Sequence, residues 1–199
     1  VNVAGYPGNA RSLLEGYGKH LTEQRPITIS TLERYVLLAN DTPGLDVKTV
    51  LSPAKNTPTQ TVSPGATDAT LIADLHKANG YVSYDNRGTW FLGPQEVTYG
   101  GSINSLFRAG DQTNAQVLLT SQTNELQYFR LGHQTPLGSN GWLLNLSAIY
   151  SVTNPDYTLA QFNVTGRYNA YSLGVSYPYI RSREKTSIFS AVLDSSNNI

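Results

Sequence analysis

The sequence predicts a small α+β domain of the order β-α-α-β-β, followed by the strands of an antiparallel transmembrane β-barrel. Helical periodicity is confined to residues 1–75, and from residue 76 to residue 199 apolar and polar residues alternate with a period of two. The clearest case has an aromatic residue at each end of its apolar face: Trp142, Leu144, Leu146, Ala148 and Tyr150. A strand of this length, tilted by roughly 45°, spans a bilayer's hydrocarbon core. One such strand equally fits a soluble sandwich, so the repetition is what favours a barrel.

Composition excludes several classes of function. The 199 residues contain 14 Lys and Arg against 14 Asp and Glu, so the chain lacks the basic excess typical of nucleic-acid binding. Only 14% of residues are charged, well below the roughly 25% of soluble domains, whereas 13 tyrosines and 17 glycines suit barrel strands. The absence of cysteine excludes disulfides, thiolate metal sites and a cysteine nucleophile. We therefore expect no nucleic-acid partner.

No segment of the sequence is long enough to cross a membrane as a helix. The longest clearly apolar run is Tyr35–Ala39, whereas a spanning helix needs about 20 residues, and the mean hydropathy is −0.30. Any membrane crossing would therefore use strands. The chain starts at Val1 without a leader, so we expect a mature chain or a fragment, and the missing leader is no guide to localisation.

Residues 1–75 carry the signals of the α+β domain. Asn9 is the predicted N-cap of a first helix, and Ser30 with Glu33 predicts a capping box for a second. Residues 40–44, which include a proline and a glycine, end the second helix. Strands are expected at Val1–Val3, Leu45–Leu51 and Thr70–Leu75, with a loop through Pro53, Pro58 and Pro64 between the last two.

This element order leaves at least one edge of the small sheet open, because both helices cover one face. An incoming segment can add a strand to such an edge. We expect the open edge at Leu45–Leu51, where the residues predicted to bind a partner are Leu45, Val47, Thr49 and Leu51. The alternative is a covered strand, since strand order cannot be read from this sequence.

Seven strands are expected between residues 76 and 199. They lie near residues 82–84, 97–103, 115–119, 126–135, 142–150 and 162–179, and from Phe189 onward. In the sixth, the apolar positions change from even to odd near Asn169, which predicts either a β-bulge or a tight hairpin. The residues expected to face lipid are Trp142, Leu144, Leu146, Ala148, Tyr150, Leu173, Val175 and Tyr177.

The connections between these strands predict two sides. Pro136 and Pro178 each close a strand before a short turn, so these turns are expected on one side of the membrane, with residues 121–125 and 151–160 on the other. Glu96, Arg130 and Arg167 are expected to face the lumen, because an arginine facing lipid costs roughly 2–4 kcal/mol at the midplane. Seven strands cannot close an even-numbered barrel, so we expect the N-terminal part of a longer protein or a different fold.

Motifs in both halves resemble the outer-membrane transporters of two-partner secretion, the haemolysin secretion and activation family. Residues 32–44 resemble the second helix and its exit in the family's second polypeptide-transport-associated (POTRA) domain, and residues 64–71 resemble the approach to its last strand. Five further motifs resemble the start of the family's barrel: Asp85–Gly88 with Gly93-Pro94, Gly110-Asp111, Tyr128, Pro136–Gly138 with Gly141-Trp142, and Tyr177-Pro178 with Ile180–Arg183.

The resemblance implies a POTRA-like periplasmic domain over residues 1–75 and the N-terminal strands of an outer-membrane barrel over residues 76–199. It implies type V export of a secreted partner, recognised in unfolded form, across outer membrane lipid and without a cofactor. The family's first periplasmic domain, later strands and sixth outer loop have no counterpart in the sequence, so the chain by itself should not transport. The alternatives are a related barrel that exports its own passenger or assembles membrane proteins, and a soluble all-β carbohydrate-binding module.

No catalytic or metal chemistry is recognisable in the sequence. His20, His76 and His133 lack ligand spacing, and no nucleophile, base and orienting group occur together. A tight turn already explains Asp85 and Arg87. We therefore expect a protein that is not an enzyme and that binds neither metal nor cofactor.

Overall fold

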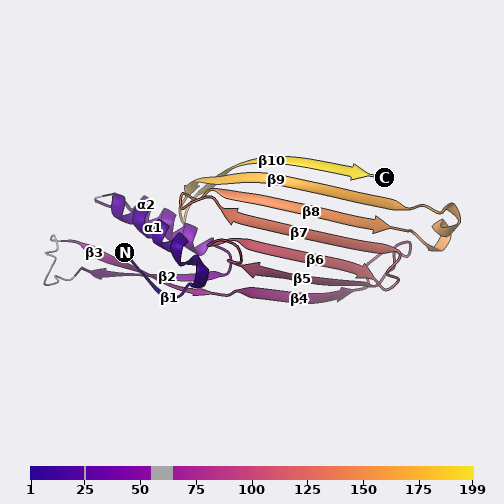
Figure 1. Cartoon of the computed structure of the whole chain (residues 1–199), viewed down its shortest axis with the longest axis horizontal. Coiled ribbons are helices and arrows are strands. Elements are labelled where there is room, and N and C mark those ends of the chain that lie inside the picture. The colour runs from indigo at the N-terminus through magenta and orange to yellow at the C-terminus, as the bar shows by residue number, and fades with distance from the viewer. Residues whose placement is uncertain (25, 55–64) are drawn as a thin grey trace.

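The computed structural model of the chain describes residues 1–24, 26–54 and 65–199, and Figure 1 shows a small sheet with its helices at one end of a long antiparallel sheet. The predicted loop positions Pro58 and Pro64 lie outside the described residues. The first elements are β1 (Asn2–Tyr6), η1 (Gly8–Ala10), α1 (Arg11–Glu23), α2 (Ile29–Asn40), β2 (Leu45–Pro53) and β3 (Thr67–Leu75). Those that follow are β4 (Ala78–Asp85), β5 (Glu96–Asn104), β6 (Gln112–Thr120), β7 (Leu126–Pro136), β8 (Leu143–Thr153), η2 (Tyr157–Phe162), β9 (Gly166–Arg181) and β10 (Thr186–Asn198).

The small sheet has the order β1-β3-β2, with β3 parallel to β1 and antiparallel to β2. Its core lies between the sheet and the helices. Leu14 on α1 and Leu71 on β3 are fully buried there, and Tyr17 and Leu38 are 3% and 6% exposed. The helical spacing of the apolar residues turns one face of each helix onto the sheet, which leaves the outer edges of β1 and β2 uncovered by strands among the described residues.

Both predicted helix starts are wrong. The N-cap of α1 is Ala10, which makes no side-chain cap bond, while the Asn9 amide Nδ2 donates 3.2 Å away to the carbonyl of Ser105. The N-cap of α2 is Thr28, whose extended backbone lets its hydroxyl accept the Thr31 amide at 3.3 Å. Ser30 therefore lies inside the first turn, two residues after the true cap.

The large sheet is a continuous meander of the order β10-β9-β8-β7-β6-β5-β4, in which each strand is antiparallel to its neighbour. Its free edges among the described residues are β4 and β10, so the sheet is open. The β5–β6, β7–β8 and β9–β10 turns lie at the end next to the helices, here called the inner end (Figure 1). The other connections lie at the outer end. The predicted grouping of the turns is confirmed.

β9 contains no bulge or hairpin at Asn169, so both predictions for that place are wrong. Its pairing with β8 is unbroken from Gly166 to Ser176. The extra residue is Tyr179, because Ser187 pairs with Ile180 and Ile188 with Pro178. Pro178 has no N–H for the ladder, which is the usual reason for a bulge at a proline. The change in parity arises because Phe162 and Val164 lie before β9 and Tyr168 belongs to the polar face.

The β5–β6 turn explains the Gly110-Asp111 motif. Asp111 is fully buried, and its carboxylate accepts the backbone amides of Leu106, Phe107 and Arg108 at 2.7, 3.0 and 2.8 Å. Gly110 has a φ of +76°, and a Cβ there would lie 2.5 Å from the Leu13 side chain of α1. The motif therefore folds the turn and lets α1 approach it.

Candidate functional site

The first candidate surface is the free edge of β2. β2 pairs with β3 along its whole length, from Leu45 opposite Leu75 to Pro53 opposite Thr67, and no other described strand pairs with it. Backbone N–H and C=O groups of alternate residues therefore point away from the sheet, where another strand can bind them.

Burial changes which side chains of β2 could contact a partner. Leu45 and Val47 belong to the core, with exposures of 9% and 6%, and the Thr49 hydroxyl is buried without a hydrogen-bond partner. Leu51 is 52% exposed. This corrects the side-chain role predicted for Leu45 and Val47, because α2 covers that face of the strand. The accessible side chains lie mainly on the opposite face, at Asp46, Lys48 and Val50.

The second candidate surface is one side of the large sheet, here called the apolar face. Directly opposed residues share a face in an antiparallel sheet. Ala148 lies opposite Leu131 on β7 and Tyr171 on β9, and Leu146 lies opposite Leu173. The Trp142 and Tyr177 rings stack with centroids 4.6 Å apart. The register extends the face to both edges through Val82, Tyr84, Tyr99, Val117, Leu119, Phe129, Phe189 and Leu193.

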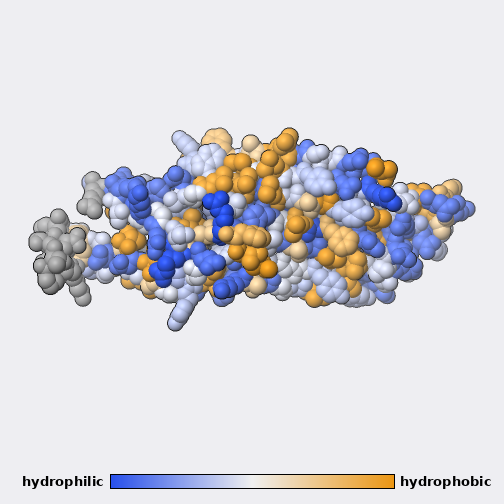
Figure 2. Space-filling view, viewed as in Figure 1, coloured by the Kyte–Doolittle hydropathy of each residue, from blue (hydrophilic) through white to orange (hydrophobic). Residues whose placement is uncertain are grey.

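The structure brings the eight residues predicted to face lipid onto this one face, and many of its side chains are exposed: Tyr171 is 61% and Leu193 71% exposed. In Figure 2 hydrophobic residues gather over the middle of the strands, and the tip of the sheet is mainly hydrophilic. An exposed apolar surface of this extent marks an interaction with lipid or protein. Which of the two covers the face stays a prediction.

The opposite face is polar. Arg130, Asn145 and Ser147 line a depression of about 220 Å³ on it. Glu96 lies opposite Thr120, and both residues are on the polar face, as predicted for Glu96. Arg167 is not on the polar face. It lies opposite Val152 and, like Tyr171, it is on the apolar face. The absence of a bulge at Asn169 puts Arg167 at the outer end of the apolar face, where a long side chain can reach water.

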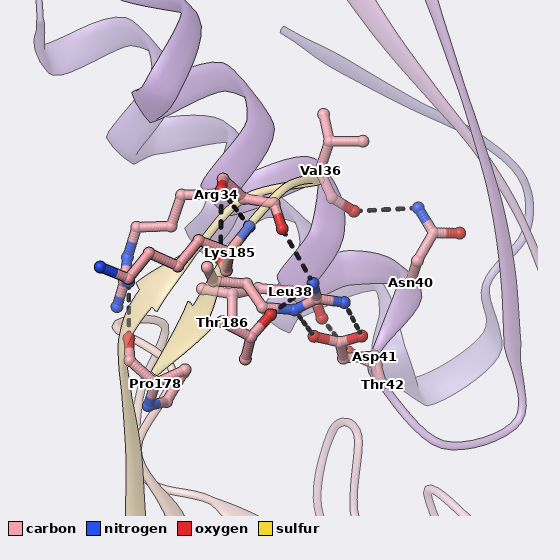
Figure 3. A network of polar contacts seen from close by, with 11 residues as sticks. Arg34, Val36, Leu38, Asn40, Asp41, Thr42, Pro178, Lys185 and Thr186 are labelled. Atoms are coloured by element: carbon pink, nitrogen blue, oxygen red, sulfur yellow. Dashed lines mark hydrogen bonds and ion pairs between the residues drawn. The ribbon is translucent and has the colours of Figure 1, made fainter. Parts of the chain in front are cut away.

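The third candidate surface is the junction between α2 and the inner end of the large sheet. Arg34 donates to the carbonyls of Pro178 (2.6 Å), Tyr179 (3.3 Å) and Asn140 (3.1 Å). Its guanidinium also lies 5.3 Å from the centre of the Tyr177 ring. Figure 3 shows Arg34 reaching Pro178 from α2, with Asp41 in the same network near Thr186. A single guanidinium thus donates hydrogen bonds to three carbonyls and lies over one aromatic ring.

α1 contacts the same end of the sheet. The His20 ring stacks on Tyr35 with centroids 4.8 Å apart, and its Nε2 lies 3.1 Å from the Ser139 hydroxyl in the β7–β8 turn. Tyr17 is packed behind Tyr35, with ring centroids 6.2 Å apart, and burial raises the pKa of Tyr17 to about 12. The junction is therefore a packed layer in which α1 and α2 contact the inner end of the large sheet.

Sequence reasoning missed the junction. Arg34, Asp41 and Arg181 lie within segments that carry the family resemblance, but a charge near the end of an element does not reveal its partner. No group of three or more His, Cys, Asp or Glu that could hold a metal occurs in the described part of the chain. Among the described residues, no helix combines the length and hydrophobicity needed to cross a membrane.

No family model matches the chain, but known proteins are similar to it in sequence and in structure. The chain is 27% identical over 153 residues to the heme/hemopexin transporter protein HuxB of Haemophilus influenzae strain 86-028NP, covering 76% of this chain and 22% of that protein. HuxB of strain KW20 / Rd is 25% identical over 163 residues, covering 81% and 24%. The chain thus spans about a quarter of the length of these curated relatives.

CdiB from Acinetobacter baumannii matches the whole chain with a TM-score of 0.64 at 16% identity, and the match covers 38% of CdiB. At this identity the likeness establishes the fold, a mostly antiparallel sheet with a few helices.

Proposed function

We propose that the chain is the POTRA-like domain and the first barrel strands of an outer-membrane transporter of the two-partner secretion class. The observation that carries the proposal is the sheet with two unlike faces, one apolar and exposed across seven strands and the other polar. The motif resemblance, the similarity to HuxB and the fold of CdiB support it. Residues 1–75 would then lie in the periplasm and residues 76–199 in the outer membrane.

Under this proposal the free edge of β2 binds the partner, and the position of this strand beside the large sheet supports that role. The strand starts at Leu45, next to Gly44, whose carbonyl accepts the His76 amide at 2.8 Å. The Asn104 side chain, at the inner end of the polar face, lies against Gly44 and donates to the His76 carbonyl at 2.8 Å. A secreted partner paired as an unfolded strand with β2 would therefore begin its passage beside the polar face. Backbone pairing and a hydrated lumen require no nucleotide or cofactor.

Partition of the purified chain between buffer and lipid vesicles tests the proposal. Trp142 is on the apolar face and Trp90 is in the outer β4–β5 connection, so the variants Trp90→Phe and Trp142→Phe each leave one reporter. We expect a blue-shifted Trp142 signal only with detergent or vesicles, and quenching of Trp142 by brominated lipid at the depth of the interface. A chain that is folded and monomeric in plain buffer, with unchanged fluorescence on addition of vesicles, would favour the soluble carbohydrate-binding module instead.

A further inference from the structure

A cavity of about 370 Å³ lies between the first half of α1 and the β5–β6 and β7–β8 turns. Small residues leave the space open: Ser12 and Gly16 on α1, and Gly138 and Ser139 in the β7–β8 turn. A Cβ on Gly16 would lie 2.7 Å from the Ser139 Cβ, so α1 and this turn meet closely on one side of the cavity. The wall is mixed, with two hydroxyls, the apolar Pro136 side chain and one cation, Arg108.

Arg108 is held at its backbone and free at its guanidinium. Its amide donates to the Asp111 carboxylate at 2.8 Å, and that carboxylate accepts two further amides of the turn. No hydrogen bond or ion pair joins the Arg108 side chain to another residue in the described ranges. Arg108 therefore brings to the wall of the cavity an exposed positive charge that is available to an anion.

The β5–β6 turn, which supplies Arg108 to the cavity, also reaches the apolar face. Phe107 is 72% exposed and Leu106 47% exposed, next to Arg108 in the chain. The Phe107 ring meets His133 edge-on, with centroids 5.8 Å apart, and His133 lies opposite Leu146 on the apolar face. The cavity thus lies between α1 and the inner turns of the large sheet, beside the inner end of the apolar face. If lipid covers the apolar face, this is the level of its headgroups.

We propose that the cavity binds the headgroup of an anionic phospholipid from the leaflet next to the small domain. Arg108 would pair with the phosphate, and the hydroxyls of Ser12 and Ser139 would bind headgroup oxygens. The acyl chains would lie along Phe107 and the apolar face. The proposal rests on the proposed function, which places that face in lipid. The exposed charges of the inner turns agree, with Arg108, Arg183 and Lys185 against Glu184.

Calorimetric titration of the whole chain in a neutral detergent tests this site. The probes are dihexanoyl phosphatidylglycerol, dihexanoyl phosphatidylcholine and inorganic phosphate. Both lipids present a phosphate to Arg108, but the choline cation offsets that charge and repels the guanidinium, whereas the glycerol hydroxyls can bind the two serines. We therefore expect the phosphatidylglycerol to bind about tenfold more tightly than the phosphatidylcholine. Inorganic phosphate should not bind measurably, because it lacks the acyl chains. Equal binding of both lipids, or binding of phosphate alone, would overturn the lipid assignment.

Three variants locate the binding. Arg108→Gln removes the charge and Ser12→Phe fills the cavity while keeping the charge, and each should weaken phosphatidylglycerol binding at least about tenfold. Arg183→Gln, a matched loss of charge on another inner turn, should change it less than about twofold. Equal losses for Arg183→Gln and Arg108→Gln would show diffuse attraction and refute the site.

An acidic peptide that binds through Arg108 where the lipid does not would assign the cavity to a protein. Failure of the chain to enter vesicles at all would reject the proposed function instead.

Discussion

The Arg181 guanidinium holds the Asp41 carboxylate by two hydrogen bonds, 2.6 Å from Nε to Oδ2 and 2.7 Å from Nη2 to Oδ1. The pair joins the end of β9 to the C-cap of α2. Both side chains reach water, with exposures of 21% for Arg181 and 45% for Asp41. The two-point geometry orients α2 on the sheet, but solvent screening limits what the pair adds to stability.

Asp41→Asn removes this pair with little change of volume. We expect the unfolding free energy to fall by about 1 kcal/mol at low ionic strength and by less at high ionic strength, because the pair is partly exposed. Denaturant unfolding at two salt concentrations measures the difference. Asp46→Asn is the control, since Asp46 is exposed and has no ion pair among the described residues. The same salt dependence in both variants would contradict the assigned role.

Arg34→Gln should destabilise the junction more than Asp41→Asn does. The substitution leaves the carbonyls of Pro178 and Asn140 without their donor and removes the cation from the Tyr177 ring. Hydrogen bonds to a charged group contribute more than a screened surface pair, so we expect a loss of about 2 kcal/mol in denaturant unfolding. Arg34→Lys should recover less than half of it, because an ammonium cannot span three carbonyls. Full recovery by lysine would mean that only the charge matters.

Tyr17 makes the stability depend on pH in the alkaline range. Burial raises its pKa from 10.0 to about 12, so the folded chain keeps a proton that the unfolded chain loses. The stabilisation is complete below pH 10 and is lost as the pH rises towards 12. The two-unit difference corresponds to about 3 kcal/mol. Unfolding free energies measured across this range should fall less steeply for Tyr17→Phe than for the parent chain, and parallel curves would refute the burial effect.

Proline substitutions at Lys48 and Thr49 test the free edge of β2. Consecutive residues of an edge strand direct their amides alternately to the paired strand and to the open side. One of the two prolines should therefore lower the melting temperature by breaking the β3 ladder, and the other should preserve it while removing a donor from the open side. We expect the preserved variant to lose binding of an unfolded partner segment. Equal destabilisation by both prolines would show that the edge is covered.

The pair Leu146→Arg and Ser147→Arg tests the two faces of β8. Leu146 is on the apolar face and Ser147 lines the polar depression. If the apolar face meets lipid, Leu146→Arg should reduce the free energy of unfolding in vesicles by about 2–4 kcal/mol. Ser147→Arg should reduce it much less. Folding yield in vesicles and in detergent measures both. A similar cost at the two positions would argue against lipid at Leu146.

The outcome of the sequence predictions follows the range of the interactions involved. The alternation in residues 142–150 and the prolines at strand ends are local signals, and the structure confirms the strands and the grouping of the turns. Helix capping is also local, but Thr28 and Ser30 both offer a hydroxyl, and only the backbone at residue 28 decided between them. For β9, the parity of Tyr168 suggested a bulge near Asn169, whereas the pairing with β8 placed the true bulge at Tyr179.

The sequence by itself determined which residues alternate, which segments are helices, and that one face of the later strands is apolar, because these properties depend on residues a few positions apart. Tertiary structure alone decided that Leu45 and Val47 are buried while the β2 backbone stays open. It also decided that Arg34 meets Pro178, 144 residues away, and that Asp41 meets Arg181, 140 residues away. The physical reason is that burial and ion pairing depend on which surfaces the fold brings together, and a single sequence carries no periodic signal for that.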